Sequence, residues 1–333
     1  MFNYLNENKM ISEARQQGKS RSFMTELMIY FIIMLVINFI TGLFSTPAIF
    51  YILFSDAELI NLMMSPTADY AELMQRMYNI MANLPEWLNI LSLFLCVIMI
   101  AVPVFYCKFI EKRSISSMGF RKPKFVSEYL NGFVVGIIMM GAVALLCVLS
   151  GAVTYEGIAR FSVPIVIFYF IGYMIQGMAE ETLIHGYFMI SSAKSTTLSY
   201  SLIMSSMLFS FAHFGNTGIS FLGYINIFLF GIFAGVYVIR RGNIWGIGAL
   251  HASWNFTQGI LFGFNVSGYS SRTSILKFVQ TEGLEKLNGG SFGPEGGLLV
   301  TLILFLAIGI VFISKPNKNE VVITENSQET EEK

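Results

Sequence analysis

Eight long apolar stretches dominate this sequence, and each is close to the length that crosses a lipid bilayer as an α-helix. They cover residues 27–46, 88–107, 129–150, 163–190, 199–214, 219–239, 245–264 and 298–314. About 20 consecutive apolar residues span the hydrocarbon layer as a helix. The pattern therefore predicts an all-α fold, a polytopic transmembrane helical bundle of about eight helices.

The composition agrees with a chain whose main partner is the lipid bilayer. Only 13% of its residues are charged, 54% are hydrophobic and the mean hydropathy is +0.63, whereas soluble domains carry about 25% charged residues. The 21 basic and 21 acidic residues balance, so the basic excess of a nucleic-acid-binding protein is missing. The high apolar content also excludes an intrinsically disordered chain. Once these classes of protein are excluded, a multi-pass membrane protein remains.

The basic residues predict the orientation of the bundle, because Lys and Arg concentrate in cytoplasmic loops. With a cytoplasmic N-terminus and eight crossings, sixteen of the 21 Lys and Arg residues fall on the cytoplasmic side. We therefore expect both termini to be cytoplasmic. The end of the chain, 315–333, is expected to be an acidic cytoplasmic tail, and the Gly-rich segment 288–297 a flexible external loop.

Ionisable side chains within the eight stretches are few and fall in three of them. A charge in hydrocarbon costs at least ~2.5 kcal/mol and therefore usually marks a functional site. Away from the chain termini, these residues are Glu180, Glu181, His185, His213 and His251. They include all three histidines of the chain, which makes this set the candidate functional site.

Helical spacing draws the same groups together. Residues four apart share one helical face, and this spacing occurs in three pairs, Glu181–His185, Phe209–His213 and His251–Asn255. Asn226 adds a further amide in the sixth stretch. Many glycines and alanines surround these positions, and small residues let helices approach closely in lipid. We therefore expect one polar cluster inside a tight bundle.

Two carboxylates, imidazoles and amides suit the activation of water. A glutamate can take the proton from water, and a histidine can hold the water or a metal ion. A zinc site of Glu180, His213 and His251 could form, since one Glu and two His are known catalytic ligands, although the HExxH motif is absent. The alternative is that these residues are hydrogen-bonded structural groups that hold the helices together.

The residues also resemble the signature of a known family, whose motifs are EExxxR, FxxxH, a helix with Asn or Asp, and HxxxN or HxxxD. In the same order, this sequence has Glu180-Glu181-x-x-x-His185, Phe209-x-x-x-His213, Asn226 and His251-x-x-x-Asn255. On these motifs the chain resembles the CPBP intramembrane proteases (CAAX protease and bacteriocin-processing, also called Abi). The segment 113–121 likewise resembles the cytoplasmic loop that precedes the core of that family.

The resemblance implies a membrane-embedded endopeptidase of the plasma (cytoplasmic) membrane, with a site that opens to the cytoplasmic side. By position, Glu180 would be the general base on water, and His213 would help to hold that water. His251 and Asn255 would form the oxyanion site, and Glu181 would be a supporting carboxylate. The family has been described both with and without a metal, so the resemblance leaves zinc open.

Three further residues, His185, Asn226 and Phe209, would support the site. His185 departs from the family pattern, because that position is Arg in the motif, and Arg is always charged whereas His can be neutral. This departure favours an alternative, a catalytically weak or inactive bacteriocin immunity or binding protein. A proton-coupled transporter is a second alternative, although the sequence shows none of the repeats typical of transporters.

The expected substrate is a peptide or lipidated peptide, in bacteriocin maturation, self-immunity or signal-peptide processing. The chain is expected to divide into five parts: a cytoplasmic segment 1–26, accessory transmembrane helices and loops 27–159, a CPBP/Abi-like protease core 160–264, an external loop with the last transmembrane helix 265–314, and the tail 315–333. No oligomeric state is predicted.

Overall fold

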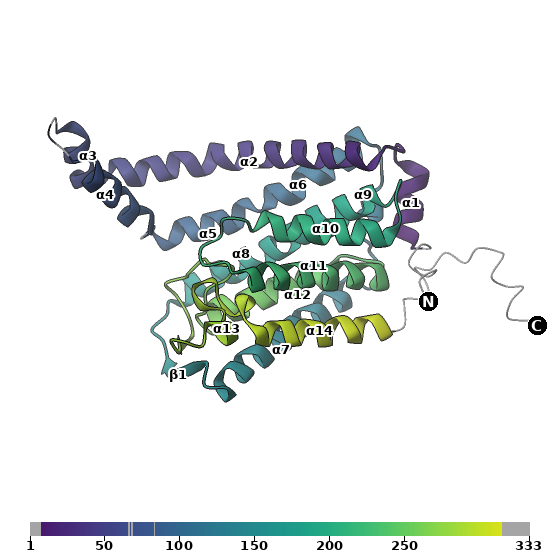
Figure 1. Cartoon of the computed structure of the whole chain (residues 1–333). Helices are drawn as coiled ribbons and strands as arrows, with labels where there is room; N and C mark the ends of the chain where they lie inside the picture. Colours follow the sequence, from purple (N-terminus) through teal and green to yellow (C-terminus); the bar gives the residue numbers. More distant parts are fainter. Residues whose placement is uncertain (1–7, 66, 68, 83, 315–333) are drawn as a thin grey trace, which may run out of the picture.

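The computed structural model describes residues 8–314 except 66, 68 and 83, and it shows long helices that run side by side (Figure 1). Helix α1 (Lys9–Gln17) and the C-terminal end of α14 (Leu298–Ile313) lie at the same end of this bundle. The expected tail 315–333 lies outside the described residues.

All eight predicted stretches are helical. They form α2 (Phe23–Phe54), α5 (Glu86–Leu95) with α6 (Val97–Phe105), α7 (Phe125–Leu149), α8 (Val163–Glu181) with α9 (Ile190–Ser192), α10 (Leu198–Ala212), α11 (Phe221–Arg241), α12 (Trp245–Phe256) and α14. Within the described residues, five spans are long and apolar enough to cross a membrane, namely α2, α5–α6, α7, α8–α9 and α11. The helical membrane bundle is thus confirmed, whereas eight crossings and cytoplasmic termini remain predictions.

Three helices continue as π-helical turns, a feature that the apolar pattern does not predict. These turns are Tyr106–Ile110 after α6, Thr182–Met189 between α8 and α9, and Thr257–Leu261 after α12. A π-helical turn widens the helix locally and is frequent at functional sites. Two of the three turns follow helices that carry candidate site residues.

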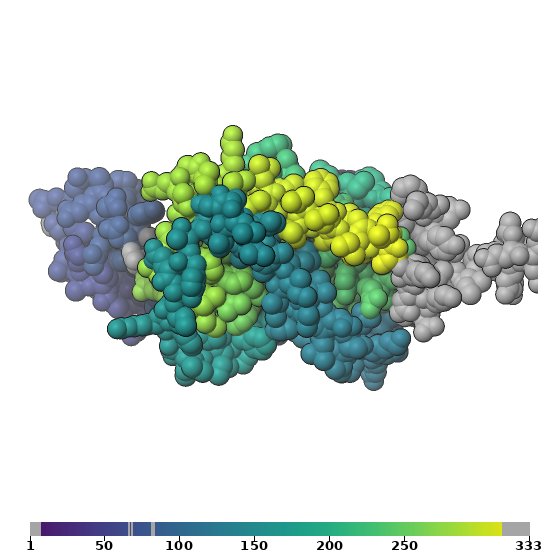
Figure 2. Space-filling view, turned by 90° about the horizontal axis from the view of Figure 1, so that it is seen from below, coloured from purple at the N-terminus to yellow at the C-terminus, as the bar shows by residue number. Residues whose placement is uncertain are grey.

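Several shorter elements lie outside the predicted stretches. Helices α3 (Ala57–Met64) and α4 (Tyr70–Ala82) protrude beyond one end of the bundle (Figures 1 and 2), where Arg76 bridges Asp56 at 2.6 Å and Glu58 at 2.7 Å. The hydrogen bond from Arg76 holds the pKa of Asp56 below its usual range. Strands β1 (Val153–Ile158) and β2 (Leu276–Gln280) form an antiparallel pair with a bulge between Tyr155 and Gly157.

The segment 288–297 is packed and not the flexible loop that its glycines predicted. It includes the end of α13 (Glu285–Asn288), and Phe292 within it is fully buried. Gly293 has a φ of +101°, and a Cβ there would lie 2.0 Å from the carbonyl oxygen of Asn265. Its glycine therefore serves a left-handed turn and a close backbone approach, which a larger residue would prevent.

Helix α12 packs against α7 and α8 through glycines, as the small residues predicted. A Cβ on Gly136 of α7 would lie 2.3 Å from the carbonyl oxygen of Leu250, and a Cβ on Gly177 of α8 would lie 2.4 Å from the amide nitrogen of Ala252. Contacts this close exist only because the glycines lack side chains. Helix α12 is thereby held beside the part of α8 that carries the glutamates.

A buried ion cluster joins α2 to the ends of the neighbouring helices. Lys194, just after α9, lies 3.0 Å from Glu26 of α2 and also contacts Glu111. The Nε atom of Arg113 lies 3.7 Å from Glu111, so a residue of the cytoplasmic-loop resemblance belongs to this cluster. Opposite charges that are buried together are costly to separate, so the cluster fixes α2 against the bundle.

Candidate active site

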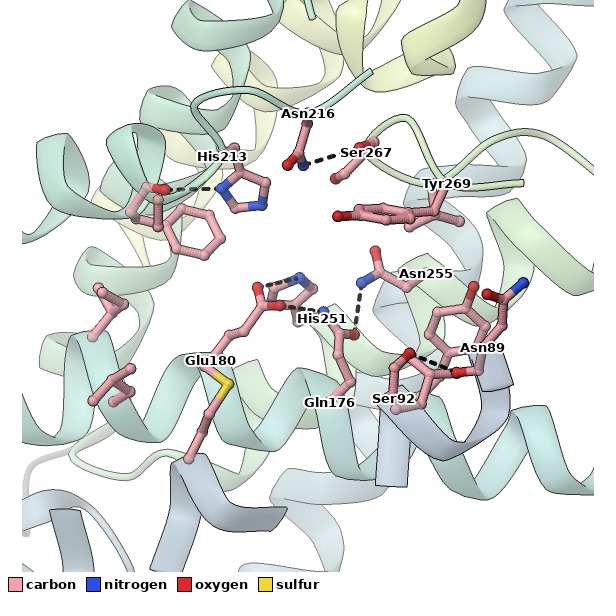
Figure 3. A pocket seen from close by; sticks show the side chains of 18 of the residues that line it. Asn89, Ser92, Gln176, Glu180, His213, Asn216, His251, Asn255, Ser267 and Tyr269 are labelled. Atoms are coloured by element: carbon pink, nitrogen blue, oxygen red, sulfur yellow. Dashed lines mark hydrogen bonds and ion pairs between the residues drawn. The ribbon is translucent and has the colours of Figure 1, made fainter. Parts of the chain in front are cut away.

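A cavity of about 430 Å³ opens among helices α8, α10 and α12 (Figure 3). It is lined by Gln176 and Glu180 from α8, His213 after α10, and His251 and Asn255 from α12. Four candidate residues predicted from the sequence thus meet at one cavity, although they come from three different helices.

Glu181 lies beside this cavity and is fully buried between two histidines. Its Oε2 atom is 2.6 Å from Nδ1 of His185, and its Oε1 atom is 2.8 Å from Nδ1 of His251. A carboxylate that hydrogen-bonds one imidazole nitrogen fixes the orientation of the ring and the role of its other nitrogen. Glu181 therefore orients His251, whose Nε2 atom faces Glu180 at 3.7 Å.

His185 occupies the position of the motif arginine and makes two hydrogen bonds. Its Nε2 atom lies 3.0 Å from the carbonyl oxygen of Gly231, which can only accept, so Nε2 carries a proton. Its Nδ1 atom faces Glu181, so that a further proton must lie between these two groups, on the imidazole or on the carboxyl. The pair is therefore either an imidazolium with a carboxylate or a neutral imidazole with a carboxylic acid. In both forms His185 takes the place of the motif arginine as the partner of Glu181.

Glu180 is held from one side and open on the other. Its Oε1 atom accepts a hydrogen bond from Nε2 of Gln176 at 2.5 Å. Its Oε2 atom is buried and has no hydrogen-bond partner among the described residues. A buried carboxylate oxygen without a partner is costly, so this atom is poised to accept a proton or a hydrogen bond from a molecule in the cavity.

Gln176 is a site residue that our sequence analysis missed. The Nδ2 atom of Asn255 donates to Oε1 of Gln176 at 2.9 Å, and Gln176 in turn donates to Glu180, so one chain of hydrogen bonds runs from α12 to the carboxylate. The signal was present, because Gln176 lies four residues before Glu180. The amide of Gln176 is uncharged, so the cost of a charge in hydrocarbon, on which the prediction rested, does not single it out.

His213 caps the C-terminal end of α10, and its Nδ1 atom donates to the carbonyl oxygen of Phe209 at 2.9 Å. This bond leaves Nε2 as the nitrogen available to the cavity. The ring of Phe209 lies between the histidines, with centroids 5.0 Å from His213, 6.0 Å from His251 and 6.4 Å from His185. Phe209 therefore forms the apolar wall of the site.

Asn226 stabilises the fold beside the cavity. Its Nδ2 atom donates to the carbonyl oxygens of Glu295 and Gly297, at 2.7 and 2.9 Å. Its Oδ1 atom accepts from the hydroxyl group of Thr301 at 2.6 Å. The side chain thereby ties α11 to the packed segment 288–297 and to α14.

The residues expected to bind zinc do not form a ready-made metal site. Among the described residues, no group of three or more His, Cys, Asp or Glu side chains is close enough to hold a metal ion. His251 uses its Nδ1 atom on Glu181, which leaves its Nε2 atom free, and one free nitrogen is all that a metal-bound histidine requires. The side chains of Glu180, His213 and His251 are thus not gathered as a metal site in this arrangement, and zinc binding stays a prediction.

Loop residues that the sequence analysis did not select complete the cavity. Asn216 follows α10, and Ser267 and Tyr269 belong to the segment after α12 (Figure 3). The Nδ2 atom of Asn216 donates to the carbonyl oxygen of Ser267 at 3.0 Å. These loops lie at the end of the bundle opposite to α1 (Figure 1). With cytoplasmic termini, this is the outer side and not the cytoplasmic side that the resemblance implies.

One known family matches the part of the chain that contains the candidate site. The family described as type II CAAX prenyl endopeptidase Rce1-like matches residues 162–257. This segment is similar to the Rce1-like family. The match covers less than a third of the chain and contains α8, α9, α10, α11 and α12. The match is consistent with the CPBP family, and neither a curated protein nor a solved structure matches the chain.

The matched segment contains every candidate site residue from the sequence, together with Gln176. The matched family is one of membrane proteases, and the segment similar to it lies here within a helical membrane bundle. Helices α2, α5, α6, α7 and α14 contact the matched segment, and Asn89 and Ser92 of α5 also line the cavity.

Proposed function

We propose that this protein is an intramembrane endopeptidase that hydrolyses a peptide bond with water activated by Glu180. The observation that carries the proposal is the open Oε2 atom of Glu180, which lies 3.7 Å from Nε2 of His251 at the edge of the cavity. A water oxygen about 2.8 Å from both atoms fits this separation. Such a water could donate a hydrogen bond to Glu180 and accept one from Nε2 of His251 when that nitrogen is protonated.

The proposed reaction balances with the groups present. Glu180 takes a proton from water while the water oxygen attacks the carbonyl carbon of the peptide. The bond between that carbon and the amide nitrogen then breaks, and Glu180 returns the proton to the leaving amine. The products are a carboxylic acid and an amine, and the carboxylate of Glu180 is restored because it has given up its proton.

The neighbouring groups support the base and the developing oxyanion. His251, oriented by Glu181, faces the position of the water and can donate to the oxyanion when its Nε2 atom is protonated. The amide of Asn255 is used on Gln176, so we propose that Asn255 acts mainly by holding Glu180 through that residue. The free Nε2 atom of His213 would help to hold the water.

Substrate and location are proposed from the family and the membrane bundle. A peptide or lipidated peptide in the plasma membrane fits a cavity that opens among membrane helices. Bacteriocin maturation, self-immunity and signal-peptide processing are the processes that we propose for such a protease. The contacts that His185 makes with Glu181 and Gly231 favour an active protease over an inactive binding protein.

The proposal is tested with the purified chain reconstituted into lipid vesicles. A pool of membrane-soluble peptides, with and without a farnesylated cysteine, is incubated with the vesicles, and new peptide termini are detected by mass spectrometry. We expect new termini with the protein and none with empty vesicles. Peptide or proton flux without cleavage would contradict the proposal and favour a transporter, and binding without cleavage would favour an immunity protein.

Replacing Gln176 by leucine is expected to lower kcat roughly 10- to 100-fold, because a hydrogen bond to a charged group contributes about 1.5–3 kcal/mol. Leucine has a similar size but neither donates to Glu180 nor accepts from Asn255. The KM is expected to stay unchanged, since the residue acts through Glu180. Steady-state kinetics on a peptide identified by the cleavage assay measure both constants, and an unchanged kcat would exclude this role for Gln176.

Treatment with a zinc chelator is expected to leave the cleavage rate unchanged, because Glu180, His213 and His251 are not placed as a metal site. Elemental analysis of the purified protein is expected to find zinc well below one ion per chain. A stoichiometric zinc content, together with a loss of cleavage in chelator that added zinc restores, would show that the side chains rearrange around a metal.

A further inference from the structure

A separate basic cavity of about 650 Å³ lies at the end of the bundle that carries α1. The cations that line it come from α1, from the turn after α6, from the segment before α7 and from the end of α11. They are Lys9, Lys108, Arg121, Lys122, Lys124 and Arg241. Among the described residues that line this basic cavity, Glu128 is the sole acid. The charge of its wall is therefore strongly positive.

Ion pairs neutralise only part of this wall. Arg241 binds Glu128 through two hydrogen bonds of 2.6 and 3.0 Å, and Arg121 lies 2.8 Å from Glu13. Within the part of the chain that the structure describes, the four lysines make no ion pair, and all four are exposed. Their ammonium groups surround one hollow, which concentrates positive potential where an anion could bind.

Exposed apolar side chains adjoin the lysines. Phe109 follows Lys108 directly and is 58% exposed. Phe125 and Val126 follow Lys124 and are 47% and 53% exposed. In a membrane protein, large apolar groups exposed beside cations match a ligand with an anionic head and hydrocarbon chains.

We propose that the basic cavity binds the phosphate-bearing head group of an anionic membrane lipid, whose acyl chains lie against Phe109, Phe125 and Val126. The proposal is independent of the protease activity, since the basic cavity shares no residue with the active-site cavity. It differs from a general attraction of cytoplasmic lysines to the membrane, because it requires the lysines that line the basic cavity.

The test compares two double variants that each remove two exposed lysines at the same end of the bundle. Lys122→Gln with Lys124→Gln changes the wall of the basic cavity. Lys19→Gln with Lys112→Gln is the matched control, because these lysines are exposed but do not line the basic cavity. Thermal unfolding of both variants shows that they remain folded.

Native mass spectrometry then measures the lipid that each protein retains from detergent micelles with equal amounts of phosphatidylglycerol and phosphatidylcholine. We expect the wild-type chain and the control to prefer phosphatidylglycerol, and the Lys122/Lys124 variant to lose about fivefold in affinity for each lysine removed. An equal loss in both variants, or no preference in the wild-type chain, would overturn the proposal. Displacement by glycerol phosphate at the same concentration would overturn the lipid assignment and indicate a soluble phosphate ligand.

Discussion

Replacing Glu180 by glutamine is expected to lower the cleavage rate by about 10²–10⁴-fold, the usual contribution of a general base. Glutamine has the same shape as glutamate, and its carbonyl oxygen can still accept the hydrogen bond from Gln176. It cannot take a proton from water, so the loss isolates the chemical role of the carboxylate. The rate is measured on a peptide identified in reconstituted vesicles, at equal protein concentration.

Glu282→Gln is the matched control for this variant, since Glu282 is an exposed glutamate outside the segment that matches the Rce1-like family. We expect its cleavage rate and its unfolding temperature to equal those of the wild-type chain. Glu180→Gln should share that unfolding temperature or exceed it, because an open buried carboxylate destabilises the native state. A Glu180→Gln chain that cleaves at the wild-type rate would exclude Glu180 as the base.

Gly177→Ala is expected to destabilise the bundle by about 1–3 kcal/mol, the usual cost of overpacking. The new Cβ would lie 2.4 Å from the amide nitrogen and 2.7 Å from the Cα of Ala252, and backbone atoms cannot turn away as a flexible side chain can. Helices α8 and α12 must therefore separate, which moves Glu180 away from His251. A displacement of about 1 Å in a catalytic site can cost 10²-fold in rate.

Gly141→Ala provides the matched comparison within α7, because a Cβ at Gly141 meets no atom within 4 Å. We expect it to keep the cleavage rate and to unfold at the wild-type temperature or above, since alanine favours the helix more than glycine does. Thermal unfolding in detergent, together with the cleavage rate, measures both effects. Equal behaviour of the two variants would show that the close contact of α8 with α12 does not determine the site.

The candidate site was largely predictable because ionisable groups in lipid are costly and therefore few. Glu180, His213 and His251 line one cavity, and Glu181 with His185 form the hydrogen-bonded pair that their four-residue spacing predicted. The resemblance to the CPBP family rested on the same residues, and the Rce1-like match covers them. Helical periodicity and the cost of burying charge were sufficient for these predictions.

Other parts of the site depend on contacts between segments that are distant in the sequence. The bond from Asn255 to Gln176 joins two helices, and Tyr269 reaches the cavity from a loop beyond α12. The π-helical turn after Glu181 leaves no mark in the apolar pattern, because it changes hydrogen-bond register and not composition. The distances between Glu180, His213 and His251 within the shared cavity likewise depend on the relative placement of three helices.

The apolar helices of the fold were predictable from the sequence, whereas its shorter elements were not. Burial in lipid requires long apolar helices, so all eight stretches were found. Elements too short to cross a membrane, such as α3, α4 and the β1–β2 pair, carry no comparable signal, and they were missed. The glycines of 288–297 suggested flexibility, although Gly293 instead permits a close contact with Asn265.

The most direct test of the proposed chemistry is chemical rescue of a Glu180→Ala variant by formate. Removing the side chain leaves space at the cavity, which a small carboxylate can enter to take the proton from water. We predict that Glu180→Ala alone is almost inactive and that its cleavage rate rises with formate concentration, while the wild-type rate does not. A rate of Glu180→Ala that stays flat over the whole range of formate would contradict the assignment of Glu180 as the base.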